Sequence, residues 1–171
     1  MAINNSKLID SDNLVFTVLD SLSIQLFGGY DWQGEDINES TAIGSVFHAF
    51  DQPPTESVAS LTIVDASGDV DEPDISTLTE AGVEKVDSLL RSAVELQMEL
   101  DTWMASKLNE AGDLKALVTP YIVKNNGKRW QYIALRLSSK GRKIVVIGMF
   151  DVAKSDPLAK LVFRSMQTVG L

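Results

Sequence analysis

Residues 117–151, LVTPYIVKNNGKRWQYIALRLSSKGRKIVVIGMFD, decide the fold of this 171-residue chain. They contain three apolar runs joined by two short polar links, the runs being residues 117–123, 128–137 and 142–150. Each link holds a pair that tolerates positive φ, Asn126-Gly127 or Lys140-Gly141, as the tight turns of β-hairpins require. The pattern predicts a three-stranded antiparallel meander. Its last strand is apolar on both alternating sides, so we expect it at the centre of a sheet that is covered on both faces.

Shorter β-type runs precede the meander. Residues 14–19 and 22–26 predict a hairpin, and residues 43–50 and 58–64 predict two further strands. Pro53 and Pro54 separate the last two, because proline has no N–H to donate to a β-ladder. Between the hairpin and these strands, a polar segment predicts a loop or a short helix at residues 31–41.

A long helical pattern covers residues 77–111. Thr77 and Glu80 have the spacing of a capping box, and Gly112 is a natural C-terminal stop. Apolar residues recur at alternating steps of three and four, at Val86, Leu89, Ala93, Leu96, Leu100 and Trp103, and Leu90, Val94, Met104 and Leu108 widen the stripe. An unbroken helix here would be about 50 Å long, more than the roughly 40 Å width of a compact domain of this size. It therefore breaks, bends or overhangs, and we expect Leu100, Trp103 and Met104 in the core rather than facing a partner.

A final helix is predicted after residue 154. Ser155 is a good N-cap and Pro157 suits the first turn, where its missing N–H costs nothing. Its buried stripe is expected to be Leu158, Leu161, Val162, Ser165 and Met166. The order of strands, long helix, three strands and helix predicts one α+β domain over residues 1–171, with an antiparallel sheet and the two helices packed on its faces.

The net charge of −9 conceals a division along the chain. Residues 1–114 hold 22 acids and four bases, whereas residues 115–171 hold two acids and 11 bases. Such asymmetry can mark an interaction surface. We favour the alternative that the two halves pack together and neutralise each other.

Composition also limits the environment and the chemistry. The chain has no cysteine, so disulfides and thiolate metal sites are unavailable. Residues 1–7 lack the features of a signal peptide, and no apolar run approaches the ~20 residues that span a bilayer. We therefore expect a cytoplasmic protein with no membrane partner.

The residues predict no catalytic, cofactor or metal site. His48 is the only histidine, and its place among Val46 and Phe50 favours a partly buried side chain over a catalytic base. The acidic segment 65–74 suggests calcium, but its spacing does not fit an EF-hand, so a solvated loop is favoured. No phosphate-binding or nucleophile-elbow motif occurs. We expect no enzymatic activity and no cofactor, and keep a hydrolase with an unrecognised site as the third hypothesis.

The basic meander suggests nucleic-acid binding as the second hypothesis. Lysines and arginines surround Trp130, Tyr132 and Tyr121, and basic residues interleaved with aromatics can hold single-stranded nucleic acid. The acidic charge of the whole protein opposes a polyanion, so a protein partner suits these charges better.

The element order resembles the Mog1/PsbP-like fold, which the bacterial DcrB-like domains share. The most similar pieces are residues 58–64, residues 130–134 followed by 143–149, and residues 161–167. The resemblance implies a non-enzymatic domain that binds proteins. It also implies the roles that some DcrB-like domains have, as adaptor or immunity components beside type VI secretion effectors.

These observations together predict a protein-binding module, namely an adaptor, chaperone-like or immunity protein that masks a bacterial toxin or secreted effector. A strongly acidic surface suits a basic partner. The expected partner-binding residues lie in two acidic segments: Asp31, Glu35, Asp36, Asp69, Asp71, Glu72 and Asp74. A homodimer is a further form of association that the sequence leaves open.

Overall fold

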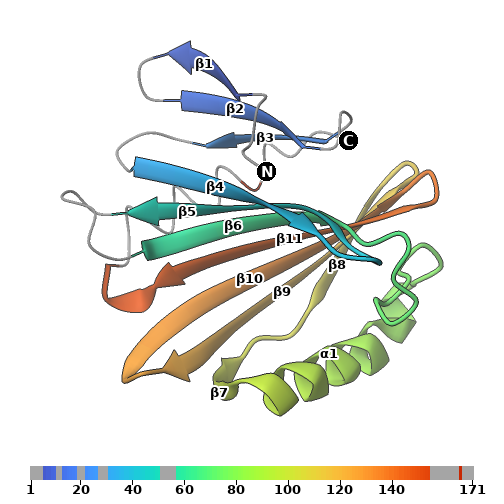
Figure 1. Ribbon diagram of the computed structural model, residues 1–171. Helices are drawn as coiled ribbons and strands as arrows, with labels where there is room; N and C mark the ends of the chain where they lie inside the picture. Colours follow the sequence, from blue (N-terminus) through green and yellow to red (C-terminus); the bar gives the residue numbers. More distant parts are fainter. Residues whose placement is uncertain are drawn as a thin grey trace.

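Within the residues that it describes continuously, the computed structural model contains two antiparallel sheets and the helix α1 (Figure 1). It describes the backbone of residues 6–10, 13–18, 22–26, 31–50 and 57–154, together with Met166. A small sheet is formed by β1 (Ser6–Asp10), β2 (Asn13–Val18) and β3 (Leu22–Leu26). The hairpin predicted near residues 14–26 is confirmed, because β2 pairs antiparallel with β3.

The larger sheet has eight strands in the order β4-β5-β6-β11-β10-β9-β7, and β8 also pairs with β9. All of its pairings are antiparallel. The strands are β4 (Asp31–Asn38), β5 (Ile43–Phe50), β6 (Ser57–Asp65), β7 (Glu99–Trp103), β8 (Lys107–Ala111), β9 (Leu114–Asn125), β10 (Lys128–Ser139) and β11 (Arg142–Asp151). The predicted meander is therefore confirmed as β9, β10 and β11, and β11 is central, between β6 and β10.

Both meander turns have the backbone that their sequences require. Asn126 and Gly127 have φ of 52° and 76°, and Lys140 and Gly141 have φ of 50° and 77°. Two successive positive φ values are typical of a type I′ turn, whose twist matches that of the flanking strands. The turns thus fix the register of the meander, in which Ser139 pairs with Arg142 and Lys128 with Asn125.

The main hydrophobic core lies on one face of the large sheet. Phe47, Leu61 and Val146 are fully buried there, and Ile24 of β3 and Met166 pack against the same cluster. Burial of such large apolar side chains is the main favourable term in folding. The predicted C-terminal helix falls outside the described residues, except for Met166, which is helical and 4% exposed.

On the opposite face, α1 (Val83–Gln97) lies beside the β9 half of the sheet (Figure 1). A 3₁₀ turn, η1 (Glu80–Gly82), precedes it, and a second, η2 (Val152–Lys154), follows β11. Val83 and Leu90 pack against Leu117 of β9, and Val94 joins a second cluster around Tyr121. The coarse class, an α+β domain with an antiparallel sheet, is confirmed.

The predicted helix over residues 77–111 is wrong in its extent. Only residues 83–97 are α-helical, Met98 is extended, and neither η1 nor α1 has a side-chain cap at its start. The rest of the segment forms β7 and β8, which pair with the outer edge of the twelve-residue β9. The backbone hydrogen bonds formed along that long edge outweigh the helix propensity of this segment, as tertiary context often does. The length argument for a break was right.

Pro120 explains why this outer partner is split into two strands. Trp103 of β7 pairs with Tyr121 and Lys107 of β8 pairs with Val118, so Pro120 lies opposite the break. Proline has no N–H for a ladder partner, although its carbonyl still accepts a hydrogen bond from the Met104 N–H at 3.1 Å. Leu100 and Trp103 are partly buried as expected, whereas Met104 is 39% exposed.

The loop or short helix predicted at residues 31–41 is also wrong. Residues 31–38 form β4, which pairs with β5 along its whole length, from Asp31 opposite Phe50 to Asn38 opposite Ile43. β4 ends the order of the described sheet, and its polar character suits an edge strand because charged side chains there discourage aggregation.

Candidate protein-binding site

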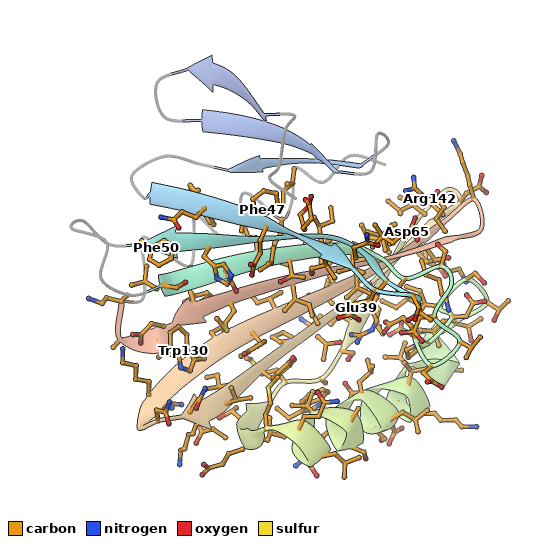
Figure 2. The ribbon with its side chains drawn as sticks, viewed as in Figure 1. Glu39, Phe47, Phe50, Asp65, Trp130 and Arg142 are labelled. Atoms are coloured by element: carbon orange, nitrogen blue, oxygen red, sulfur yellow. The ribbon has the colours of Figure 1, made fainter. Side chains whose placement is uncertain are left out.

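The acidic loop of residues 65–74 lies against the basic end of the meander. Arg136 Nε donates to Glu72 Oε1 at 2.6 Å, and these two side chains are only 16% and 17% exposed. Arg142 pairs with Asp65 at 3.3 Å, and Figure 2 shows the two residues at the same end of the sheet. Lys143 Nζ donates to the carbonyl oxygens of Asp69 at 2.5 Å and Glu72 at 3.1 Å. Three cations of the meander therefore bind this loop.

Local turns order the remaining carboxylates of the loop. The backbone N–H groups of Ser67, Asp71 and Ser76 donate to the side chains of Asp65, Asp69 and Asp74 at 2.9–3.0 Å. Burial raises the pKa of Asp65, but hydrogen bonds from Ser67 and the charge of Arg142 outweigh it and hold the pKa below its ordinary value. The hydrogen bond from Ser76 lowers the pKa of Asp74.

The carboxylates near β4 have different surroundings. Glu35 is 71% exposed, and its Oε1 lies 3.7 Å from His48 Nε2. Asp36 accepts a 3.4 Å hydrogen bond from Ser45 Oγ, and Glu39 is exposed in the turn that follows β4. Residues 31–50 contain four acids and no lysine or arginine. Within the described part of the chain, no lysine or arginine pairs with Glu35, Asp36 or Glu39.

The two acidic segments meet at one end of the sheet. Ile43, at the start of β5, pairs with Asp65, at the end of β6, so the turn holding Glu39 lies near the start of the acidic loop. Figure 2 shows Glu39 and Asp65 at this end and Trp130 at the other. The seven predicted partner-binding residues thus fall into two sets. Glu35 and Asp36 are exposed on the edge strand, and Asp31 lies on the same strand with only its backbone described. Among the loop residues, Asp71 and Asp74 are exposed, whereas Asp69 and Glu72 are partly buried.

The meander does not present a basic aromatic platform. Lys124 and Arg129 both pair with Asp101, at 3.4 and 2.8 Å, and the hydrogen bonds from Arg129 lower the pKa of Asp101. Lys128 lies 4.0 Å from Asp151 and 6.0 Å from the centre of the Trp130 ring. The charges that would bind a nucleic-acid backbone are largely occupied by carboxylates.

The aromatic residues of the meander belong to the layer beside α1. Trp103, Tyr121 and Tyr132 stack in a row across β7, β9 and β10, with ring centres 5.3 and 5.1 Å apart. Burial raises the pKa of Tyr121 to about 12 and also raises that of Tyr132. These rings are core residues rather than a surface on which bases could stack.

A buried polar cluster joins α1 to the connection between β7 and β8. Asp87 accepts hydrogen bonds from Trp103 Nε1 at 3.1 Å and from the Ser106 N–H and Oγ at 2.8 and 2.6 Å. Burial raises the pKa of Asp87, but these hydrogen bonds outweigh it and lower the pKa overall. The sequence interpretation left Asp87 off the buried stripe. Its spacing from Val83, Leu90 and Val94, at four, three and seven residues, is the signal that places it on the buried side.

The outer side of α1 carries two exposed leucines that the sequence interpretation wrongly assigned to the buried stripe. Leu89 is 60% exposed and Leu96 is 88% exposed. The buried side is instead the one that contains Val83 and Leu90. Both stripes have helical spacing, so periodicity alone could not decide which of them faces β9.

No group of three or more potential ligands that could hold a metal ion occurs in the described ranges. His48 is partly exposed, and its Nε2 lies 3.7 Å from Glu35 Oε1. The helix that the structure describes is too short and too polar to cross a membrane.

Comparison with known proteins identifies the fold. No protein-family model and no curated protein matches the chain. The solution structure of cyanobacterial PsbP (CyanoP) from Synechocystis sp. PCC 6803 matches with a TM-score of 0.67 at 14% identity, over 98% of this chain and 97% of that one. PA94, a protein of unknown function from Pseudomonas aeruginosa, gives a TM-score of 0.44 at 11% identity over 96% of each chain. The chain therefore has the PsbP-like fold, as the element order predicted. This likeness is one of fold alone.

Proposed function

We propose that the protein is a non-enzymatic protein-binding module that takes a basic segment of its partner along β4. The observation that carries this proposal is that Glu35 and Asp36 of β4 are exposed and lack lysine or arginine partners within the described residues. The PsbP-like fold is compatible with a non-enzymatic module. An adaptor, chaperone-like or immunity protein that masks a bacterial toxin or secreted effector in the cytoplasm is the biological form we propose.

An edge strand can bind an extended peptide by adding it as a further strand. Main-chain hydrogen bonds then give affinity, and alternate side chains give specificity. Glu35 and Asp36 point to opposite faces of the sheet because successive side chains of a strand alternate. A bound segment with lysine or arginine at successive positions could therefore form ion pairs on both faces. Long-range attraction to the acidic edge would also accelerate the encounter.

The loop of residues 65–74 is a weaker candidate for the same role. Glu72 is held by Arg136, and Lys143 fixes the backbone on which Asp69 and Glu72 lie. A partner would have to displace these contacts or use Asp71 and Asp74, which are exposed. We therefore propose Glu35 and Asp36 as the main charged contacts, and Asp71 and Asp74 as minor ones.

The proposal is tested with a fluorescent peptide of lysine and valine, about as long as β4 and with two successive lysines at its centre, whose binding is followed by anisotropy. Glu35→Lys with Asp36→Lys should weaken binding about tenfold at low salt, and less at physiological salt, because salt screens exposed charges. The matched control is Asp71→Lys with Asp74→Lys, which makes the same change in net charge on the loop. It should weaken binding by less than about threefold. Equal losses in the two variants would contradict a site on β4.

The natural partner can then be sought by comparison of the same three proteins. Affinity capture from the source cell, with wild type and both charge-reversal variants as bait, should yield a basic protein that is lost only with the β4 variant. Capture of the same proteins by all three baits would contradict the proposal.

A further inference from the structure

The outer face of α1 carries two exposed leucines and, beside one of them, a groove. Leu96 is 88% exposed and Leu89 is 60% exposed, although each is a large apolar side chain. They are seven residues apart, so they lie two turns apart on one side of the helix, about 10 Å along its axis. The opposite side of α1 already packs on β9 through Val83 and Leu90. The helix therefore has apolar residues to bury on a second side.

A groove of about 500 Å³ runs beside Leu89 on this outer face. It is lined by Ala81, Glu84, Lys85, Ser88, Leu89 and Ser92. Four of these residues, at positions 85, 88, 89 and 92, have the spacing of the hole that receives a knob when two helices pack. Leu96 itself lies outside the groove, one turn beyond Ser92.

We propose that this face docks a second copy of the chain, with the two α1 helices antiparallel and Leu96 of each copy in the groove beside Leu89 of the other. A twofold axis between residues 92 and 93 places position 96 of one helix opposite position 89 of its partner. The contact is then made twice by the same surface, as a closed twofold dimer requires. This surface lies on α1, so the proposal does not depend on binding at β4.

Charge supports the antiparallel direction. Lys85 lies near the start of α1, and Glu99, which opposes Lys124 in the β7–β9 pairing, follows its end; both are exposed. An antiparallel pair brings Lys85 of one copy toward Glu99 of the other, whereas a parallel pair brings like charges together. Arg91 and Glu95 already pair at 2.7 Å within each helix and add no net charge to the face. Antiparallel helix dipoles also attract each other.

The expected dimer is weak. Two helices of 15 residues bury an area below the roughly 1,200 Å² at which specific complexes become stable. We therefore expect a dissociation constant of about 100 μM, measurable by sedimentation equilibrium up to about 1 mM chain. Leu96→Ala and Leu89→Ala should each weaken association about tenfold. Val70→Ala is the matched control, because Val70 is apolar and 93% exposed but belongs to the acidic loop and not to α1, and it should leave association unchanged.

Lys85 and Glu99 supply a test of direction. Lys85→Glu should weaken association, and Lys85→Glu combined with Glu99→Lys should restore it, because each pair across the axis is then again of opposite charge. A double variant as weak as the single one would overturn the antiparallel arrangement.

The chain has no cysteine, so single cysteines can report the register directly. Under mild oxidation Ser92→Cys should form a disulfide-linked dimer, because the two copies of residue 92 meet at the axis. Ser88→Cys lies on the same face, but its two copies would be about 13 Å apart, beyond disulfide reach, and it should stay monomeric. Equal cross-linking of both variants, or a monomer at about 1 mM, would overturn the proposal. In the second case the leucines would face a different protein.

Discussion

The two acidic segments of this molecule have similar composition and opposite surroundings. In the loop of residues 65–74, arginines of the meander pair with Asp65 and Glu72, and Lys143 binds two backbone carbonyls. In β4, the polar partners of the Glu35 and Asp36 side chains in the described part of the chain are His48 and Ser45. Acidic composition alone therefore does not identify a binding surface. The partners of each carboxylate do identify one, because a carboxylate that is already paired within the protein binds a ligand less readily.

The same contrast explains how far the two oppositely charged halves of the chain neutralise each other. The cations of residues 115–171 neutralise the loop and Asp101, but none of those described pairs with Glu35, Asp36 or Glu39. Internal neutralisation is therefore extensive around the loop and missing around β4. If this contrast is correct, variants of the loop should change stability, and variants of β4 should change binding.

The largest expected effect on stability is that of Arg136→Met. It leaves Glu72 as a largely buried carboxylate without its cation, which we expect to cost about 2–3 kcal/mol of unfolding free energy. Urea denaturation followed by circular dichroism measures the change. A loss below about 0.5 kcal/mol would show that the loop carboxylate is as unconstrained as those of β4.

Lys143→Met should have a smaller effect, about 1 kcal/mol, because it removes two hydrogen bonds from a charged donor to loop carbonyls at a partly exposed site. Hydrogen exchange should become faster in residues 66–74. Exchange in β4 is the internal control and should stay the same. Unchanged exchange in the loop would mean that Lys143 does not order it.

Asp65→Asn tests the loop through pH. The pKa of Asp65 is lowered in the folded protein, so its carboxylate contributes stability that is present above its ordinary value of 3.8 and is lost as pH falls through the folded pKa. The variant should therefore lose stability near neutral pH and show a shallower decline in acid. Val70→Ala, an exposed and uncharged site in the same loop, should keep the wild-type pH dependence. An unchanged slope in Asp65→Asn would contradict the pairing.

The smallest effect on stability is expected for Glu35→Gln combined with Asp36→Asn. Neither side chain has a lysine or arginine partner among the described residues, so the unfolding free energy should change by less than about 0.5 kcal/mol. Thermal unfolding near neutral pH measures this. A loss as large as that of Arg136→Met would assign these carboxylates a structural role and remove the contrast with the loop.

The sequence predicted the meander well because its signals are local. Alternating apolar residues and the pairs Asn126-Gly127 and Lys140-Gly141 specify strands and turns without reference to the rest of the chain. The polar residues of β4 carry no such signal. That segment becomes a strand because β5 offers it an edge to pair with, which is a tertiary contribution.

The error around residues 77–111 and the pairing of the acidic loop both have their origin in contacts between distant parts of the chain. Leu100 and Trp103 continue the helical spacing of α1, but the demand of β9 for partners makes them part of a strand. Asp65 and Arg142 are 77 positions apart, so their pairing could not be read from the sequence. What could be inferred was that the two halves neutralise each other. Which carboxylates remain available to a partner could not be inferred.

The most direct test of the central claim is a residue-resolved NMR titration of the full chain with the lysine-valine peptide at low salt. The amide signals of both acidic segments are then followed in one sample. We expect the backbone amide shifts of residues 31–39 to move progressively as peptide is added, while those of residues 65–74 move much less because Arg136 and Arg142 already pair with Glu72 and Asp65. Shifts that move chiefly in residues 65–74, with β4 unaffected, would contradict the account.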